Sequence, residues 1–205
     1  MSYDETNLPG KVVKYLDEIN SDKNLKDAFY YCDVDIYDVN EIIKFQEDQL
    51  WFEDMCGPGE PNYDIKPFAR DASGGLWVVL NNEKIGYIGT EGECGIVARN
   101  IDEFMNVVST LKSGFISELS DEKSFYKIFE EQNKEYKSSG VLSSFIEKNC
   151  FEKDPSKIYH ILKLGMTAKP FFLIKGKEGY LDSYSLFGLD DGQKSLEKFI
   201  KDYCN

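Results

Sequence analysis

The pattern of hydrophobic and polar residues is most regular between Lys66 and Val108. Within it, the apolar run from Leu76 to Leu80 predicts a buried β-strand. Asn81 and Asn82 tolerate positive φ and predict a tight hairpin, from which Lys84 to Ile88 returns as a second strand. A third short strand is expected from Gly95 to Ala98.

A loop and a helix are expected on either side of these strands. Asn100, with Glu103 three residues later, is typical of a capping box and predicts a helix that ends near Leu111. The turn-forming residues before the first strand are Asp71, Ser73, Gly74 and Gly75. The whole stretch therefore forms one supersecondary unit.

Helical spacing of apolar residues predicts further helices before and after this unit. They are expected at residues 11–20, 22–28, 38–54, 121–136, 141–147, 154–164 and 195–203. Asp38 and Glu41 suit the N-terminus of the third. Asp154 and Pro155 suit the start of the sixth, which Gly165 is expected to end.

The remaining segments complete the expected fold. Met55 to Tyr63 is rich in Gly and Pro and is expected to be irregular. A second hairpin is expected from a strand at Pro170 to Ile174, a turn at Lys175 to Gly179 and a strand at Tyr180 to Phe187. This order of elements predicts a single α+β domain of 205 residues, with a central, mostly antiparallel sheet and helices packed around it.

The composition adds that the chain is acidic, since 37 Asp and Glu against 24 Lys and Arg give a net charge of −13. Nucleic-acid binding is disfavoured, because phosphate contacts require clustered Lys and Arg. A basic partner is favoured, because an acidic surface speeds encounter with cationic ligands. Acidity that serves only the solubility of a cytosolic protein is the alternative.

No apolar run approaches the roughly 20 residues that cross a bilayer, and the first ten residues are polar and acidic. We therefore expect a soluble, cytoplasmic protein with no membrane partner. The five cysteines lack CxxC spacing and only one histidine, His160, could join them. Reduced thiols, no metal and no cofactor are expected.

Candidate catalytic groups are few. A Cys–His or Ser–His–Asp mechanism would depend on His160, which lies in an apolar helical stretch. The chain has no H-E-x-x-H motif, Walker A loop or Rossmann fingerprint. We expect a protein that is not an enzyme and has no catalytic residue.

Polar loops above a rigid sheet are suited to binding a protein partner. Acidic residues of these loops could gather at one edge of the sheet, as an acid/base pair, as a cation site or as a solvated rim. Aromatic residues nearby are of the type that anchors interfaces, although burial in the core is the alternative for Trp77. The candidate partner-binding residues are Asp71, Trp77, Tyr87, Glu91 and Glu93.

Short motifs follow one another in this stretch in the order and spacing of a known superfamily. They are Pro67-Phe68-Ala69, Asp71-x-x-Gly74-Gly75, Ile85-Gly86-Tyr87-Ile88-Gly89, Glu91-Gly92-Glu93, Ile96-Val97-Ala98 and Ile101-x-x-Phe104-Met105. The arrangement resembles the SUKH superfamily, which includes yeast Knr-type cell-wall regulators and many bacterial immunity proteins. Thr90 stands where many relatives have Ser, and the LP-x-x-Y entry motif common in the family is missing.

The resemblance implies that these motifs form the centre of a mixed α+β fold, to which residues from about 113 to 205 add a C-terminal extension. It also implies an immunity protein, a non-enzymatic antitoxin that neutralises a cognate toxin domain such as a nuclease. The partner would be a toxin with a basic surface, bound by a monomer or weak homodimer. The alternatives are a regulatory or scaffold protein of the Knr-like type, and a small enzyme or ligand-binding domain that uses the loops around Asp71 and Glu91.

Overall fold

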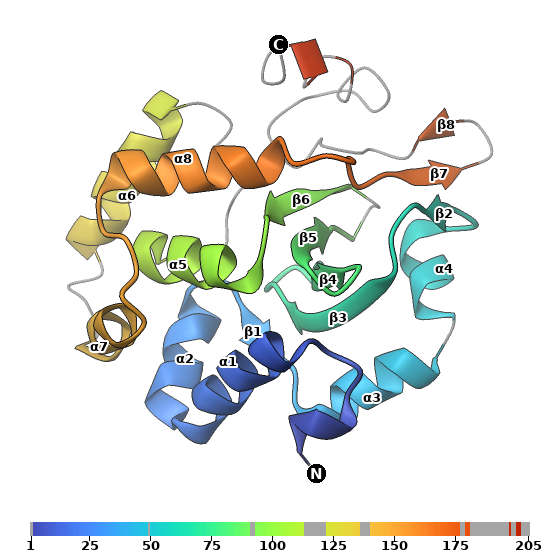
Figure 1. The fold of residues 1–205 in the computed structure, drawn as a ribbon, viewed down its shortest axis with the longest axis horizontal. Helices are drawn as coiled ribbons and strands as arrows, with labels where there is room; N and C mark the ends of the chain where they lie inside the picture. Colours follow the sequence, from blue (N-terminus) through green and yellow to red (C-terminus); the bar gives the residue numbers. More distant parts are fainter. Residues whose placement is uncertain are drawn as a thin grey trace.

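The central sheet has the strand order β1-β3-β4-β5-β6 (Figure 1). Its strands are β1 (Asp35–Ile36), β3 (Ile65–Arg70), β4 (Leu76–Leu80), β5 (Lys84–Ile88) and β6 (Cys94–Ala98). Every neighbouring pair is antiparallel, which confirms the predicted α+β class with a mostly antiparallel sheet. This computed structural model describes residues 2–48, 50–90, 93–112, 122–135, 140–176, 179–180, 197 and 200–201.

The predicted hairpin between β4 and β5 is confirmed. Asn81 and Asn82 have φ of 48° and 62°, the left-handed conformation that their short polar side chains tolerate. The Asn81 side chain also accepts a hydrogen bond from the Asp64 N–H at 2.8 Å. All five residues of β4 are buried, as the continuous apolar run predicts.

Helices surround this sheet. They are α1 (Gly10–Ser21), α2 (Lys23–Tyr31), α3 (Val39–Glu47), α4 (Trp51–Cys56), α5 (Ile101–Leu111), α6 (Glu122–Glu135), α7 (Gly140–Lys148) and α8 (Pro155–Met166), with a 3-10 turn η1 (Tyr3–Glu5) before them. In Figure 1, α5 and α8 lie side by side next to β6, and α1 and α2 lie beyond α5. The Tyr15 hydroxyl of α1 donates to Asp102 of α5 at 2.8 Å and joins these two helices.

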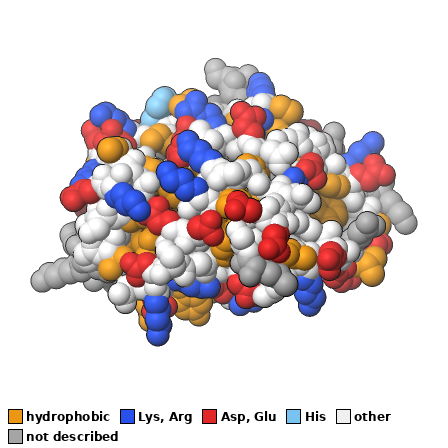
Figure 2. Space-filling model, turned by 60° about the horizontal axis from the view of Figure 1, so that its bottom comes forward, with side chains coloured by type: hydrophobic (Ala, Val, Ile, Leu, Met, Phe, Trp, Pro, Cys, Tyr) orange, Lys and Arg blue, Asp and Glu red, His pale blue; other side chains and the backbone are white. Residues whose placement is uncertain are grey.

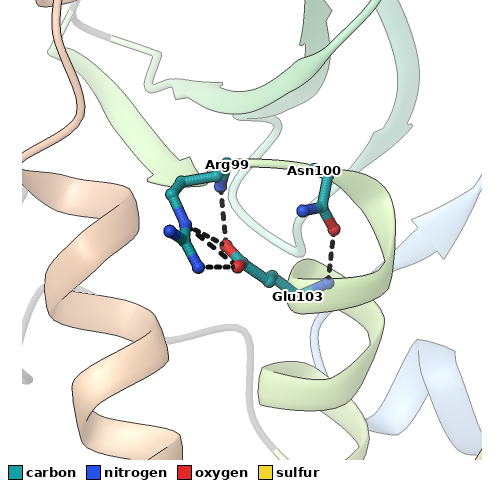
Figure 3. Close-up of polar contacts among 3 residues, drawn as sticks. All are labelled: Arg99, Asn100 and Glu103. Atoms are coloured by element: carbon teal, nitrogen blue, oxygen red, sulfur yellow. Dashed lines mark hydrogen bonds and ion pairs between the residues drawn. The ribbon is translucent and has the colours of Figure 1, made fainter.

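The predicted cap of α5 is confirmed in one of its two bonds (Figure 3). The Asn100 side chain accepts from the Glu103 N–H at 3.0 Å. The Glu103 carboxylate, however, accepts from the N–H of Arg99 at 3.1 Å, one residue before the N-cap, and it also pairs with the Arg99 guanidinium. An adjacent arginine has therefore drawn the carboxylate away from the usual reciprocal bond.

The single helix predicted from 38 to 54 is wrong, because the structure has two. Asp38 and Glu41 form the expected capping box, but α3 ends at Glu47. Asp48 is extended and its carboxylate accepts from the Leu50 N–H at 2.9 Å, a local bond that competes with helix continuation. The break lets Trp51 pack edge-on against Phe45 with ring centroids 5.7 Å apart.

The prediction that Gly165 ends its helix is also wrong. Helix α8 continues to Met166, and Gly165 lies inside it against β6. A Cβ at this position would lie 2.5 Å from the Val97 carbonyl oxygen and 2.7 Å from the Ala98 Cα. Glycine is needed here for close approach of the helix to the sheet rather than for a turn.

A second sheet of order β2-β7-β8 joins residues far apart in the chain. Its strands are β2 (Glu60–Pro61), β7 (Ile174–Gly176) and β8 (Gly179–Tyr180). The predicted hairpin is therefore shifted, because β7 begins where its first strand was expected to end. The segment just before β7 contacts Tyr63, whose hydroxyl donates a hydrogen bond to the Pro170 carbonyl at 2.5 Å.

Two predictions near the C-terminus fall largely on residues that the structure does not describe. Of the helix expected from Ser195 to Tyr203, the described residues 197, 200 and 201 are helical. The strand expected to extend to Phe187 lies outside the described residues beyond Tyr180.

Candidate partner-binding surface

Asp71, the first of the predicted binding residues, organises the loop between β3 and β4. Its Oδ1 accepts from the backbone N–H groups of Ser73 and Gly75 at 2.9 and 2.8 Å. Its Oδ2 accepts from the Tyr87 hydroxyl. These bonds fix the loop conformation, so the main role of this carboxylate is to shape the surface.

Tyr87 crosses the same loop from β5. A Cβ added at Gly75 would lie 2.1 Å from the Tyr87 hydroxyl oxygen, so only glycine leaves room for this ring. Burial, together with the adjacent Asp71 carboxylate, raises the pKa of Tyr87 far above its ordinary value. The hydroxyl is therefore a fixed donor to Asp71 at neutral pH.

Trp77 lies in the core, so the core alternative for this residue is confirmed. Its side chain is 2% exposed, and its ring packs against Tyr87 and Phe104 with centroids 4.8 and 5.1 Å away. The indole N–H donates to the Asp33 carbonyl at 3.3 Å. A side chain so buried cannot anchor a partner directly.

Glu93 lies in the connection from β5 to β6, and Glu91 lies outside the described residues. The Glu93 side chain folds over Gly89, where an added Cβ would lie 2.1 Å from its carboxyl carbon. The pairing of Leu76 with Ile88, and of Ile88 with Cys94, places this connection and the Asp71 loop at one end of the sheet. The structure thus brings Asp71 and Glu93 to the same end, as residues of separate loops.

Two exposed aromatic residues that sequence reasoning did not select lie next to the Asp71 loop. Tyr30 and Tyr31, at the end of α2, are 58% and 67% exposed, and with Leu50 they are the exposed large hydrophobic residues among those described. Their rings meet edge-to-face with centroids 5.9 Å apart. We call this pair the tyrosine ridge.

Each tyrosine of the ridge borders a different hollow. Tyr30 lines a polar hollow of about 300 Å³, whose charged lining residues are Asp33, Asp35, Arg70 and Asp71.

Tyr31 lines an apolar hollow of about 280 Å³ between α2 and α7. The walls of the apolar hollow include Ala28, Cys32, Val141 and Leu142, with Asp27 and Lys112 as its charged residues. The ridge therefore combines an aromatic edge with one polar and one apolar recess.

Asp33 joins the ridge to the Asp71 loop. It has a φ of 65° directly after α2, where its N–H donates to the Tyr30 carbonyl and the Val34 N–H donates to Phe29, both at 3.0 Å. This is the Schellman arrangement, in which glycine usually takes the left-handed position. The Asp33 carboxylate uses the position to accept from the Ala72 N–H at 2.8 Å.

Burial raises the pKa of Asp33, partly offset by the Ala72 hydrogen bond and reinforced by the Asp71 charge. Asp35 is opposite Arg70 across the β1–β3 pair and accepts from the Arg70 guanidinium at 3.0 Å. Asp35 is thus neutralised by its own strand partner, whereas Asp33 and Asp71 contribute negative charge to the hollow.

Figure 2 shows the molecule from the side that lies at the bottom of Figure 1, which carries α1 and α3. Acidic side chains are numerous there, with lysines and arginines interspersed among them. Although the whole chain has a net charge of −13, this side carries charges of both signs and is not uniformly negative.

Among the described residues, no group of three or more His, Cys, Asp or Glu is placed to hold a metal ion. His160 is exposed on α8. Burial raises the pKa of Cys32 to about 12 and that of Cys56 to about 11, so these thiols stay protonated at neutral pH. No helix in the described part of the chain is both long and apolar enough to cross a membrane.

The class that fold and surface define is an α+β protein with an exposed aromatic ridge between two recesses. Comparison of the chain with protein-family models, curated proteins and solved structures gave no match. Membership of the SUKH superfamily therefore stays a prediction from the motifs, which lie on β3 to β6, their connections and α5.

The sequence held a signal for the ridge that periodicity alone did not resolve. Helix α2 buries Leu25, Ala28 and Phe29, which lie on one face at helical spacing. Given that face, the next two residues must point elsewhere. The helix expected at residues 22–28 stopped before both tyrosines, so the direction of their rings was left open.

Proposed function

We propose that this chain is an immunity protein, which binds a cognate bacterial toxin domain with a basic surface and thereby neutralises it. The observation that carries the proposal is the SUKH-like order of motifs along consecutive strands of one sheet, their connections and the helix that follows. Bacterial members of that superfamily include many immunity proteins.

Polar residues near the motifs fix the surface loops by hydrogen bonds, which supports a binding role. Asp71 holds its loop and the Tyr87 hydroxyl, and Asp33 holds Ala72. Such groups build a rigid surface, and rigid surfaces bind with a smaller loss of conformational entropy. The net charge of −13 supports a basic partner, since complementary charge raises the association rate.

The proposal predicts that a toxin domain is encoded next to this gene, and co-expression with that domain tests the proposal. Growth of cells that produce the toxin domain should be restored by this chain, and the two proteins should copurify as a stable complex. An unrelated protein of similar size and charge serves as the control and should give neither result. If the neighbouring toxin is neither bound nor neutralised, the proposal fails, and stable endogenous partners would instead favour the Knr-like regulatory role.

A further inference from the structure

We infer that the tyrosine ridge, together with the two hollows beside it, is the surface on which a basic protein partner docks. The inference rests on the proposed function for the identity of that partner. Its structural basis is the exposure of Tyr30 and Tyr31, the rigidity of the segment that carries them and the charge of the polar hollow.

Both tyrosines of the ridge are open to a partner. Tyr30 and Tyr31 are more than half exposed, so folding gains little from their rings. Tyrosine is enriched at interfaces because it buries a large area on binding and loses little side-chain conformational entropy. Two adjacent rings in edge contact offer such area at one place.

The segment that carries the ridge is rigid. Phe29, the residue before the ridge, is fully buried and packs edge-on against Phe145 of α7 with centroids 5.3 Å apart. After the ridge, the Schellman bonds and the bond from the Ala72 N–H to Asp33 fix the chain direction. The backbone under both tyrosines is therefore held in place before a partner arrives.

The charge of the polar hollow decides the chemistry of the partner. The polar hollow is lined by Asp33, Asp35, Arg70 and Asp71, and because Arg70 pairs with Asp35, the carboxylates of Asp33 and Asp71 leave the hollow negative. A guanidinium suits this hollow, because its donors can bond carboxylates while its plane stacks on an aromatic ring. We therefore assign the polar hollow to an arginine of the partner, seated against Tyr30.

The apolar hollow completes the match. It is lined by Tyr31, and its exposed surface is largely apolar, with Ala28, Val141 and Leu142 among its walls. An apolar side chain close to the arginine on the partner can enter it. The partner is thus a protein with a basic face and an adjacent apolar residue, whereas nucleic acid would meet carboxylates in the polar hollow.

Calorimetric titration of the neighbouring toxin domain into variants of this chain tests the inference. Tyr30→Ser with Tyr31→Ser should raise Kd about 100-fold, as loss of an aromatic anchor pair does. Asp33→Asn with Asp35→Asn should raise Kd about tenfold through lost charge pairing. Asparagine at position 33 retains both an acceptor for Ala72 and tolerance of positive φ.

Matched controls lie elsewhere on the surface. Leu50→Ser removes an exposed hydrophobic side chain, and Glu83→Gln with Glu131→Gln removes two exposed carboxylates away from the ridge. Both controls should bind within about threefold of the wild type, since positions outside the interface contribute little to affinity. Wild-type-like binding by the tyrosine double variant, with its circular dichroism unchanged, would overturn the inference.

A second measurement separates failure of the surface from failure of the proposed function. If the wild type does not bind the toxin domain, the probe becomes hexa-arginine amide, followed by amide NMR shifts. Shifts that cluster at Tyr30, Tyr31 and residues 72–74, and vanish in the tyrosine double variant, would sustain the surface while the immunity role falls. Shifts spread evenly over acidic residues would overturn the surface as well.

Discussion

At Gly165, a single methyl group decides how closely α8 can approach the sheet. We predict that Gly165→Ala lowers the free energy of unfolding by about 1–3 kcal/mol, the usual cost of overpacking, because its Cβ would meet backbone atoms of β6 that cannot rotate away. Gly10→Ala is the matched helical control, since nothing lies within 4 Å of its Cβ. Urea unfolding of both variants measures the difference, and equal stability would contradict this account of Gly165.

Asp33 combines an unusual backbone angle with a structural hydrogen bond. Asp33→Ala should lower the free energy of unfolding by about 1–3 kcal/mol, since alanine disfavours positive φ and leaves the Ala72 N–H without its acceptor. Asp33→Asn should stay within about 0.5 kcal/mol of the wild type at pH 7, because it retains both features. An alanine variant as stable as the asparagine variant would show that the cap is dispensable.

The pH dependence of Asp33 has a definite sign. Burial raises its pKa above the ordinary 3.8, so the native state holds this proton more tightly than the unfolded state. Stability from this group is therefore fully present below pH 3.8 and lost as pH rises through the folded pKa. Relative to the wild type, Asp33→Asn should therefore gain stability as pH rises from below 3.8 through the folded pKa of Asp33. Melting temperatures across this range test the sign, and a loss instead of a gain would refute it.

At the scale of elements, α5 is held to the segment before α8 by a buried amide. Oriented to satisfy both partners, Asn106 donates to the Glu152 carbonyl at 3.0 Å and accepts from the Glu152 N–H at 3.2 Å. Asn106 is only 7% exposed and supplies an acceptor for the Glu152 N–H, whereas the Glu152 carbonyl also accepts from the Thr110 hydroxyl at 3.3 Å.

We therefore predict that Asn106→Leu lowers the free energy of unfolding by about 1–3 kcal/mol, because the Glu152 N–H loses this acceptor while the Glu152 carbonyl keeps the Thr110 hydroxyl as a donor. Ser144→Ala, which removes an exposed helix-surface hydroxyl, should change stability by less than about 0.5 kcal/mol and serves as control. Chemical denaturation measures both. An Asn106→Leu variant of unchanged stability would mean that water replaces the amide.

Elements with local signals were predictable from the sequence, and those that depend on distant partners were not. The β4–β5 hairpin was predictable because its apolar run and its Asn pair lie next to each other. Strands β1 and β2, two residues each, escaped prediction because they exist through pairing with β3 and β7. The break after α3 was missed because one Asp48 side chain competes with helix continuation.

The candidate surface, too, was predictable from the sequence only in part. Asp71 was selected for its place in a polar loop, and the structure places it on the wall of the polar hollow. Tyr30 and Tyr31 were not selected, because their exposure depends on how α2 packs with α7 and β1. Trp77 has a residue type common at interfaces, but its strand is buried on both faces.

At the scale of the whole molecule, the proposed complex depends on charge attraction as well as on the ridge. The association rate of this chain with the neighbouring toxin domain should fall about tenfold or more between about 0.05 and 0.5 M salt, because ions screen the attraction between exposed charges. Stopped-flow fluorescence measures the rate. A rate that does not depend on salt would argue against a basic partner.

The measurement that tests the central claim most directly is hydrogen–deuterium exchange of this chain, alone and in complex with the neighbouring toxin domain. We predict that exchange slows in the complex at the end of α2 and in β1, and also in the loop from Asp71 to Gly75, while α6 is unchanged. Protection confined to α6 or α8, or the absence of any complex, would contradict the account.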